Sequence, residues 1–286
     1  MKLEKYHGLG NDYYVYDCQK NDYLLSQSQI RLLCDRHFGL GSDGILVGPI
    51  FQDGMIGLRI MNPDGSEAEK SGNGVRIFAK YLKDAGYVTE DSCLLSTPGG
   101  FVTVEYLNEE NTMIKASMGK LSFQSRDLGI TGPNQDIINK SFVFNHQDYR
   151  CTCVSVGNPH CIIPVEKVSK ELIMEIGPHA ETAPYWPNRI NTQIIEIIDR
   201  YNIKTEGYER GAGYTYASGT GACAAAAAAY RLGLTEASVN VHMPKGVLEI
   251  NIDSDWNCSM TGKVCKIGSF TLSNEFMREN KFDFTF

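Results

Sequence analysis

Apolar and polar residues alternate with a period of two along most of the chain, in short runs separated by Gly, Pro and Asn. This alternation is typical of half-buried β-strands, and the separating residues favour turns. The pattern predicts nine strands: YYVYDC (13–18), GILVGPI (44–50), MIGLRIM (55–61), FVTVEYL (101–107), TMIKASM (112–118), CTCVSV (151–156), CIIPV (161–165), TQIIEIID (192–199) and VLEINI (247–252).

A helical period interrupts the strands four times. Helices are predicted within Ser26–His37, VRIFAKYLKDA (75–85), Glu166–Ile176 and ACAAAAAAYRL (222–232). The second of these places Val75, Phe78 and Leu82 on one stripe, and the alanines of the fourth allow close packing on all sides. Two helices and several short strands in each half predict an α+β fold.

The chain repeats itself at an offset of 147 residues. Ser71-Gly-Asn-Gly and Ser218-Gly-Thr-Gly share this offset (218 − 71 = 147), and each serine is followed 15 residues later by a glycine suited to end a helix. The other matches, in the same order, are Gly10-Asn11-Asp12 with Gly157-Asn158-Pro159, Asn62 with Glu209, the two remaining helical patterns with each other, and 97–106 with 243–252 after a one-residue slip.

We therefore predict an internal duplication of two pseudo-symmetric domains, each a curved, mostly antiparallel sheet wrapped around a central helix. The first domain is predicted to comprise 1–117 and 263–286, and the second 118–262. The active site is expected in the cleft between them.

Both S-G-x-G segments stand at the expected start of a helix. Free N–H groups and the positive end of the helix dipole favour anions there, and glycine allows close approach of the backbone. Two such starts facing one cleft would hold one carboxylate and place residues 71 and 218 on opposite sides of the adjacent carbon. Proton transfer at such a carbon normally uses thiols, because a serine hydroxyl is a far weaker acid. Each serine taken alone also fits a simple N-cap.

Composition and charge indicate which classes of binding partner are to be expected. The chain has 286 residues, 42% of them hydrophobic, and a net charge of −7 without a basic stripe, so we expect no nucleic acid. No apolar run is long enough to cross a bilayer, so we expect a cytoplasmic protein without membrane contact. Nine scattered cysteines indicate a reducing compartment, and Cys151-Thr152-Cys153, although followed by His160 and Cys161, lacks a second pair at zinc spacing. We therefore expect buried cysteines and no metal.

Six long segments resemble the diaminopimelate epimerase family: HGLGNDYYVYD, RHFGLGSDGILV, MNPDGSEAEKSGNGVRIFAKYL, VSVGNPHCIIPV, NRINTQIIEI and YERGAGYTYASGTGACAAAAAA. The resemblance runs over essentially the whole chain. It implies a cofactor-independent amino-acid epimerase, without pyridoxal phosphate, that is a homodimer and interconverts LL- and meso-diaminopimelate by two-base proton transfer on the route to lysine and peptidoglycan precursors.

The chain departs from this family at the two catalytic positions. The family has cysteine before each G-x-G, and here Ser71 and Ser218 occupy those positions. Three explanations are open: an engineered, inactivated protein that traps substrate, a natural relative that uses hydroxyls for other chemistry, as do dehydratases of the wider proline racemase superfamily, and a natural protein that binds without turnover.

The resemblance also implies roles for matching residues. Glu209 and His160 match residues that assist the thiols and hold the substrate ammonium, and Arg210 matches the arginine that grips the distal carboxylate. The distal end is contacted by Asn11, Asn62, Asn158 and Asn191, and the reacting carboxylate by Gly72, Asn73, Gly219 and Thr220. Lys70, Tyr214 and Tyr216 differ from the family pattern, so another amino-acid racemase, such as a histidine racemase, and a non-catalytic amino-acid-binding protein remain alternatives.

Overall fold

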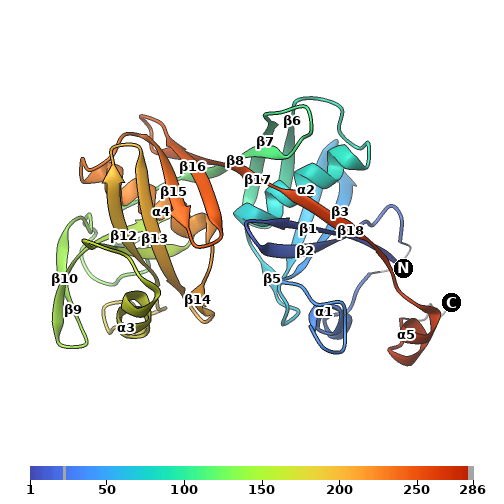
Figure 1. Ribbon diagram of the computed structural model, residues 1–286, viewed down its shortest axis with the longest axis horizontal. Coiled ribbons are helices and arrows are strands. Elements are labelled where there is room, and N and C mark those ends of the chain that lie inside the picture. The colour runs from blue at the N-terminus through green and yellow to red at the C-terminus, as the bar shows by residue number, and fades with distance from the viewer. Residues whose placement is uncertain (22–23, 283–286) are drawn as a thin grey trace. The chain divides into compact units, whose positions relative to one another are not determined.

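The computed structural model describes residues 1–21 and 24–282, and the chain divides into two compact units (Figure 1). One unit contains 1–116 and 263–286, and the other contains 117–262. The last four residues of the predicted first domain, 283–286, lie outside the described residues.

The first unit contains β1 (Lys2–Gly8), β2 (Asn11–Tyr16), α1 (Gln27–Cys34), β3 (Ile45–Gln52), β4 (Met55–Met61), β5 (Glu67–Ala68), α2 (Gly72–Asp84), β6 (Ser92–Thr97), β7 (Gly100–Tyr106), the start of β8 (Met113–Lys120), β18 (Cys265–Thr271) and α5 (Asn274–Glu279). The second contains the end of β8, β9 (Lys140–Phe144), β10 (Gln147–Ser155), β11 (Pro159–Pro164), α3 (Lys170–Glu181), β12 (Asn191–Asp199), β13 (Asn202–Glu209), β14 (Gly213–Thr215), α4 (Gly219–Arg231), β15 (Ser238–Met243), β16 (Gly246–Ile252) and β17 (Asn257–Lys263).

The two units pair their strands by one scheme. In the first, β18, β1 and β2 are antiparallel, β2 is parallel to β3, β3 antiparallel to β4, β4 parallel to β6, and β6, β7 and β8 antiparallel. In the second, β9, β10 and β11 are antiparallel, β11 is parallel to β12, β12 antiparallel to β13, β13 parallel to β15, and β15, β16 and β17 antiparallel. The order of parallel and antiparallel pairs is therefore the same in both units. The predicted mostly antiparallel α+β fold is confirmed, and the repeated scheme fits an internal duplication.

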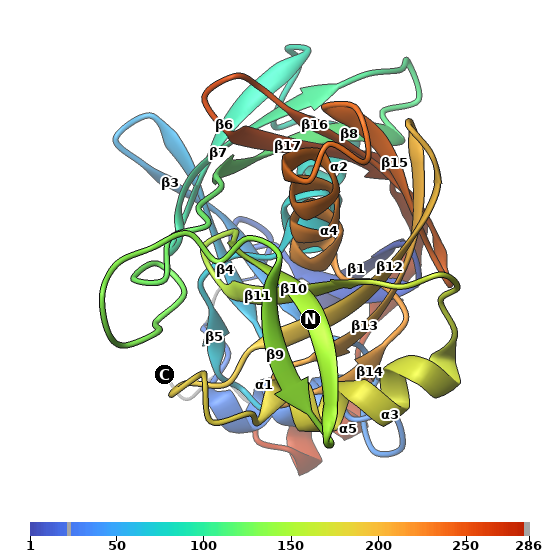
Figure 2. The same cartoon turned by 90° about the vertical axis from the view of Figure 1, so that its left-hand side faces the viewer.

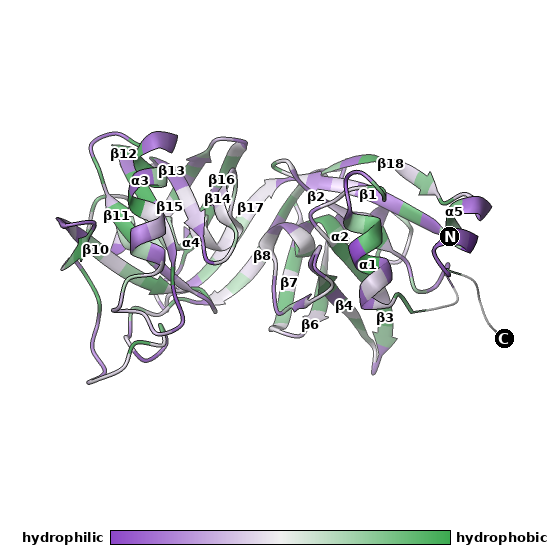
Figure 3. Cartoon of the chain, turned by 90° about the horizontal axis from the view of Figure 1, so that it is seen from below, coloured by the Kyte–Doolittle hydropathy of each residue, from purple (hydrophilic) through white to green (hydrophobic). Residues whose placement is uncertain are grey.

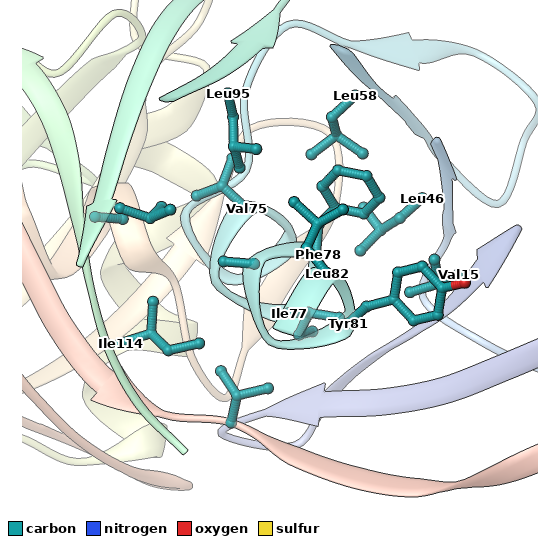
Figure 4. Packing of buried hydrophobic residues seen from close by; sticks show 14 of the residues in the cluster. Val15, Leu46, Leu58, Val75, Ile77, Phe78, Tyr81, Leu82, Leu95 and Ile114 are labelled. Carbon is teal, nitrogen blue, oxygen red and sulfur yellow. The ribbon is translucent and has the colours of Figure 1, made fainter. Parts of the chain in front are cut away.

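Each unit wraps its sheet around one buried helix. Every residue of α2 from Gly72 to Leu82 is buried, and Phe78 packs within the first core with Val75, Leu46 and Leu58 (Figure 4). In the second unit α4 is surrounded by strands (Figure 2), and its run Ala222–Ala229 is buried. Small side chains let the sheet approach α4 closely, whereas large side chains fill the space around α2.

Two predicted helices have different ends. The first begins after Ser26 as expected but ends at Cys34, because Asp35 turns extended and its carboxylate accepts the N–H groups of His37 and Phe38. The third begins later than predicted, after Ser169, whose hydroxyl caps the helix by accepting the N–H of Leu172.

Several strands were not predicted because their sequences do not alternate strictly between apolar and polar residues. Figure 3 shows the hydrophobic and hydrophilic residues along each strand. In β1 the buried residues Leu3 and Tyr6 are three positions apart, because a bulge shifts the register between Lys5 and Tyr6. Strand β13 was missed because charged residues and Gly207 interrupt its sequence, NIKTEGYE.

Candidate active site

The two S-G-x-G segments form nearly identical helix starts. Ser71 has backbone angles φ −140° and ψ 118°, and Ser218 has φ −127° and ψ 120°. Each serine Oγ accepts the N–H of the second glycine, Gly74 or Gly221, at 3.1 Å. Both serines are therefore N-caps, and the next two residues of each helix, Gly72 and Asn73 or Gly219 and Thr220, carry N–H groups without an acceptor inside the helix.

The second glycine of each motif packs closely against the serine. A Cβ at Gly74 would lie 3.2 Å from Ser71 Oγ, and a Cβ at Gly221 would lie 3.0 Å from Ser218 Oγ. Any larger residue there would press on the hydroxyl. The motif thus fixes the position of the side chain at 71 or 218.

In the first unit, polar side chains connect the helix start to strand β2. Asn73 Nδ2 donates to Asn11 Oδ1 at 3.1 Å, and Asn11 Nδ2 donates to Asp43 Oδ2 at 2.9 Å. The fully buried Arg76 donates to Asn73 Oδ1 and to the Gly72 carbonyl. Because a guanidinium only donates, it fixes the amide orientation of Asn73 and, through it, that of Asn11.

Asn62 lies at the turn after β4. Its Nδ2 donates to Ser66 Oγ at 3.0 Å, and its backbone N–H donates to the Ser66 carbonyl at 2.8 Å. Its side chain therefore participates in the 62–66 turn. Of the five candidate residues in this unit, Asn11 and Asn73 contact each other directly, and Asn73 follows Ser71 and Gly72 in the chain.

Tyr13 contacts the first helix start, although no sequence motif singled it out. Tyr13 is 7% exposed, and its hydroxyl oxygen lies 3.3 Å from Ser71 Oγ. The repeat offset supplied a signal for it, because 13 + 147 = 160 and position 160 is the candidate His160.

In the second unit, the corresponding strand carries His160, which is fully buried. Its Nδ1 lies 3.0 Å from Gln193 Oε1 and its Nε2 lies 3.0 Å from Asn158 Oδ1, while Asn158 Nδ2 donates to Thr220 Oγ1 at 3.4 Å. Burial is the main cause that lowers the pKa of His160 to about 4, and the positive charge of Arg210 acts in the same direction. The ring is therefore neutral at pH 7.

A neutral imidazole has one donor and one acceptor nitrogen, so one neighbouring amide must present its N–H to the ring. We assign this to Gln193. As placed, its buried Nε2 has no hydrogen-bond partner among the described residues, and neither has Thr215 Oγ1. Both residues line a small pocket beside Ser218. A reversed Gln193 amide donates to Nδ1 and leaves Nε2–H to donate to Asn158.

Glu209 ends β13 and contacts the second helix start. Burial raises the pKa of the Glu209 carboxyl, and a hydrogen bond from the Ser218 hydroxyl lowers it to a smaller extent. A carboxyl with a raised pKa is suited to take up and release a proton. Ser218 thus has an acid–base partner in its own unit.

The Asn191 side chain is hydrogen-bonded to the backbone of Arg210. Asn191 is 6% exposed, its Nδ2 donates to the Pro159 carbonyl at 2.9 Å, and its Oδ1 accepts the N–H of Arg210 at 2.9 Å. The Arg210 side chain is exposed, and its Nη1 donates to the Asn188 carbonyl at 3.2 Å. Asn191 therefore holds the segment that presents the guanidinium.

Six of the nine cysteines are buried, Cys18 and Cys93 are half-buried, and Cys265 is exposed. Cys151, Cys153 and Cys161 are fully buried in one hydrophobic core, and Cys223 is fully buried in α4. Within residues 1–21 and 24–282, no three His, Cys, Asp or Glu side chains are arranged to hold a metal ion. Nor does any described helix have the length and apolar character needed to span a membrane.

The chain is similar in sequence to diaminopimelate epimerases. The family described as diaminopimelate epimerase matches residues 3–124 and 152–267. Diaminopimelate epimerase 2 of Nostoc sp. (strain PCC 7120) is 43% identical over 276 residues, 96% of each chain. The diaminopimelate epimerase of Pelotomaculum thermopropionicum is 37% identical over 267 residues, 92% of this chain and 95% of that protein.

Solved structures of other racemases share the fold. A probable proline racemase from Agrobacterium radiobacter K84, with bound carbonate, aligns with a TM-score of 0.69 at 14% identity over 96% of this chain and 93% of that chain. A hydroxyproline epimerase from Agrobacterium vitis aligns with a TM-score of 0.67 at 13% identity over 94% and 91%. At this identity the likeness concerns the fold alone.

Proposed function

The chain belongs to the diaminopimelate epimerase family, and we propose that it binds diaminopimelate with both helix starts directed at one α-carboxylate. The observation that carries this proposal is the serine-capped helix start, built twice with the same hydrogen bond and similar backbone angles. Two such starts offer four backbone N–H groups, from Gly72, Asn73, Gly219 and Thr220, to an anion.

In this proposal the side chains at 71 and 218 act on opposite faces of the α-carbon. A proton leaves one face and another returns to the opposite face, which inverts the stereocentre. Glu209 supports this role at position 218, because burial raises the pKa of its carboxyl and the neighbouring Ser218 hydroxyl offsets this only in part. Glu209 is proposed to hold the substrate ammonium, because a carboxylate accepts hydrogen bonds. Both ring nitrogens of the buried His160 are engaged by Gln193 and Asn158, so His160 is proposed to act by positioning Asn158.

The distal end of the substrate is assigned to Asn11, Asn62, Asn158, Asn191 and Arg210. Arginine suits the distal carboxylate because its planar guanidinium can donate two parallel hydrogen bonds. The exposed guanidinium of Arg210, presented by a backbone that Asn191 holds, supports this assignment. A histidine racemase would have no use for this second carboxylate site.

The hydroxyl groups of Ser71 and Ser218 limit the rate of epimerisation in this proposal. A serine is a much weaker acid than a thiol, and we propose that Ser71 and Ser218 give little or no turnover while binding is retained. We further propose that the protein acts in the cytoplasm as a homodimer, without pyridoxal phosphate or another cofactor.

The proposal is tested by restoring the thiols. The double variant Ser71→Cys/Ser218→Cys should epimerise LL-diaminopimelate in D₂O with deuterium appearing at the α-carbon, at a rate at least about 10²-fold above the unaltered chain, a gain of the size that a well-placed acid–base group supplies. The matched control is Ser66→Cys/Ser169→Cys, which adds two thiols away from positions 71 and 218 and should give no gain. No gain in the first variant would contradict the epimerase assignment.

Substrate choice is tested separately by calorimetric titration of the unaltered chain. Diaminopimelate isomers should bind, and histidine and lysine, which lack the distal carboxylate, should bind more weakly. Binding of histidine without binding of diaminopimelate would favour the histidine racemase alternative. Binding of diaminopimelate together with failure of the restored thiols would favour a non-catalytic binding protein.

A further inference from the structure

We infer that Tyr13 is the acid–base partner of position 71 and serves the first helix start as Glu209 serves the second. This inference rests on the proposed function, to which it adds a positioning residue. Tyr13 acts through the side chain at 71 and need not touch the substrate.

Tyr13 and Ser71 contact each other through their hydroxyl groups. The Tyr13 hydroxyl oxygen lies 3.3 Å from Ser71 Oγ, and both residues belong to the same unit. Ser71 Oγ already accepts the N–H of Gly74 at 3.1 Å. The two hydroxyls therefore form a donor–acceptor pair in which either oxygen can give its proton to the other.

Both members of the pair are held in place by the surrounding backbone. A Cβ at Gly44 would lie 2.7 Å from Tyr13 Cε1 and 2.5 Å from the Met61 carbonyl oxygen, so the Tyr13 ring packs directly on the backbone at residue 44. Ser71 is fixed by its cap and by the close approach of Gly74. Fixed geometry of this kind is needed for efficient proton transfer.

The repeat also relates the groups that surround the two serines. At the repeat offset of 147, Tyr13 corresponds to His160 (13 + 147 = 160) and Asn62 to Glu209 (62 + 147 = 209). In the second unit the acid–base partner of Ser218 is Glu209, which belongs to the aligned pair 62 and 209. In the first unit that position holds Asn62, an amide that does not titrate and that bonds Ser66. The titratable group next to Ser71 is instead Tyr13, which belongs to the aligned pair 13 and 160.

The chemistry of the pair follows from ordinary acid strengths. A phenol has a pKa of about 10, far below that of an aliphatic alcohol. The Tyr13 phenol must first release its proton to solvent water. In the deprotonation step, the α C–H bond then breaks and its electron pair stays on carbon, Ser71 Oγ takes that proton, and the original Ser71 proton passes to the Tyr13 phenolate, which becomes a phenol again. No group is oxidised or reduced. With a thiol at 71, the phenol O–H instead donates to the thiolate and lowers its pKa.

The thiol case gives a direct test that does not need turnover. Ser71→Cys, Ser71→Cys/Tyr13→Phe and Ser71→Cys/Tyr14→Phe are each alkylated with iodoacetamide across a pH series, and the peptide that carries the new thiol at position 71 is quantified by mass spectrometry. Tyr14 is the matched control, because it precedes Val15 in the same strand but packs in a different core, with its hydroxyl toward the Leu40 carbonyl. The nearby cations Lys70 and Arg76 are the same in all three variants.

Loss of the Tyr13 hydroxyl should raise the midpoint of alkylation at position 71 by about one pH unit, the shift expected for one hydrogen bond to a charged group. Loss of the Tyr14 hydroxyl should leave the midpoint unchanged. Equal midpoints in all three proteins, or equal shifts from Tyr13→Phe and Tyr14→Phe, would overturn the inference. Because diaminopimelate is absent from this measurement, failure of the proposed substrate would leave its result intact.

A second measurement keeps Tyr13 in place. In the otherwise unaltered chain labelled with ¹³C at tyrosine Cζ, the Tyr13 signal is assigned by its loss in Tyr13→Phe. Ser71→Ala should move the pH midpoint of that signal, and the control Ser66→Ala should not. If the pH midpoint of the Tyr13 signal were unchanged in Ser71→Ala, the pairing would be contradicted even if the cysteine variants fail to fold.

Discussion

The two halves of this chain keep the same helix start but surround it with different chemistry. In the first, Ser71 faces the Tyr13 hydroxyl, and the adjoining network contains the charged groups Arg76 and Asp43. In the second, Ser218 faces the Glu209 carboxyl, and the adjoining network joins neutral His160 to two amides. The duplication thus preserved the backbone that presents residues 71 and 218, while the groups that exchange protons with them diverged.

The central helices differ in the same way. Position 78 in α2 holds Phe78, and the corresponding position in α4 (78 + 147 = 225) holds Ala225. Both side chains are fully buried. Equivalent positions therefore bury very different amounts of apolar surface, and the two units should respond differently to truncation.

The largest expected effect is the loss of Phe78. Phe78→Ala should reduce the free energy of unfolding of the first unit by about 3–5 kcal/mol, because a large cavity remains in its core. Urea unfolding followed by circular dichroism reports on both units. Tryptophan fluorescence reports on the second, because the chain has two tryptophans and both Trp186 and Trp256 lie in 117–262.

The matched change in the second unit is Ala225→Gly. It should cost only about 1 kcal/mol, the difference in helix propensity between alanine and glycine, and this loss should be visible by fluorescence. Similar losses from both changes would mean that the two cores are packed alike and would break the comparison.

The next effect concerns His160, whose pKa is lowered by burial to about 4. A lowered pKa means that the unfolded chain binds a proton in the window between about pH 6.5 and pH 4 that the folded chain does not. Stability is therefore lost as the pH falls through this window, by on the order of 2 kcal/mol between about pH 7.5 and pH 5. His160→Asn should remove that part of the loss, measured by urea unfolding with tryptophan fluorescence at both pH values.

The control for this change is His146→Asn. His146 is exposed and has φ 64°, a conformation that asparagine tolerates well, so the substitution should not strain the backbone. If the pH dependence of stability were the same in His160→Asn as in the unaltered chain, another group would have to be responsible for acid lability.

Much of the fold could be predicted from sequence because alternation and helix stops are local signals. The strand Met55–Met61 was predicted with its observed bounds, and Gly86 and Gly233 follow the central helices with φ 77° and 73°. The bulge in β1 could not be predicted, since it depends on pairing with β18 on the far side of the sequence. The repeat offset marks position 13, but the contact between the Tyr13 hydroxyl and Ser71, 58 positions further along the chain, forms only once the unit has folded.

Among the candidate site residues, sequence identified those in long motifs but not their partners. Gln193, which contacts the buried His160, lies inside the predicted strand 192–199 and carries no local mark of function. The direction of the Asn62 side chain, toward Ser66, likewise depends on the turn geometry. Polar networks of this kind are set by tertiary contacts, and the sequence pattern does not encode them locally.

The smallest expected effect tests what the two halves still share. Ser71→Ala and Ser218→Ala should each cost about 1 kcal/mol of stability, the usual loss when an N-cap serine is replaced by alanine. Replacement by glycine should cost only a few tenths, because glycine is tolerated at the N-cap. The measurement is urea unfolding by circular dichroism for Ser71 variants and by tryptophan fluorescence for Ser218 variants. Equal losses are expected because both serines accept one backbone N–H at 3.1 Å with similar backbone angles. A much larger loss for Ser218→Ala at pH 7 would mean that the contact with Glu209 stabilises the fold, and position 218 would then differ from position 71 in structure as well as in chemistry.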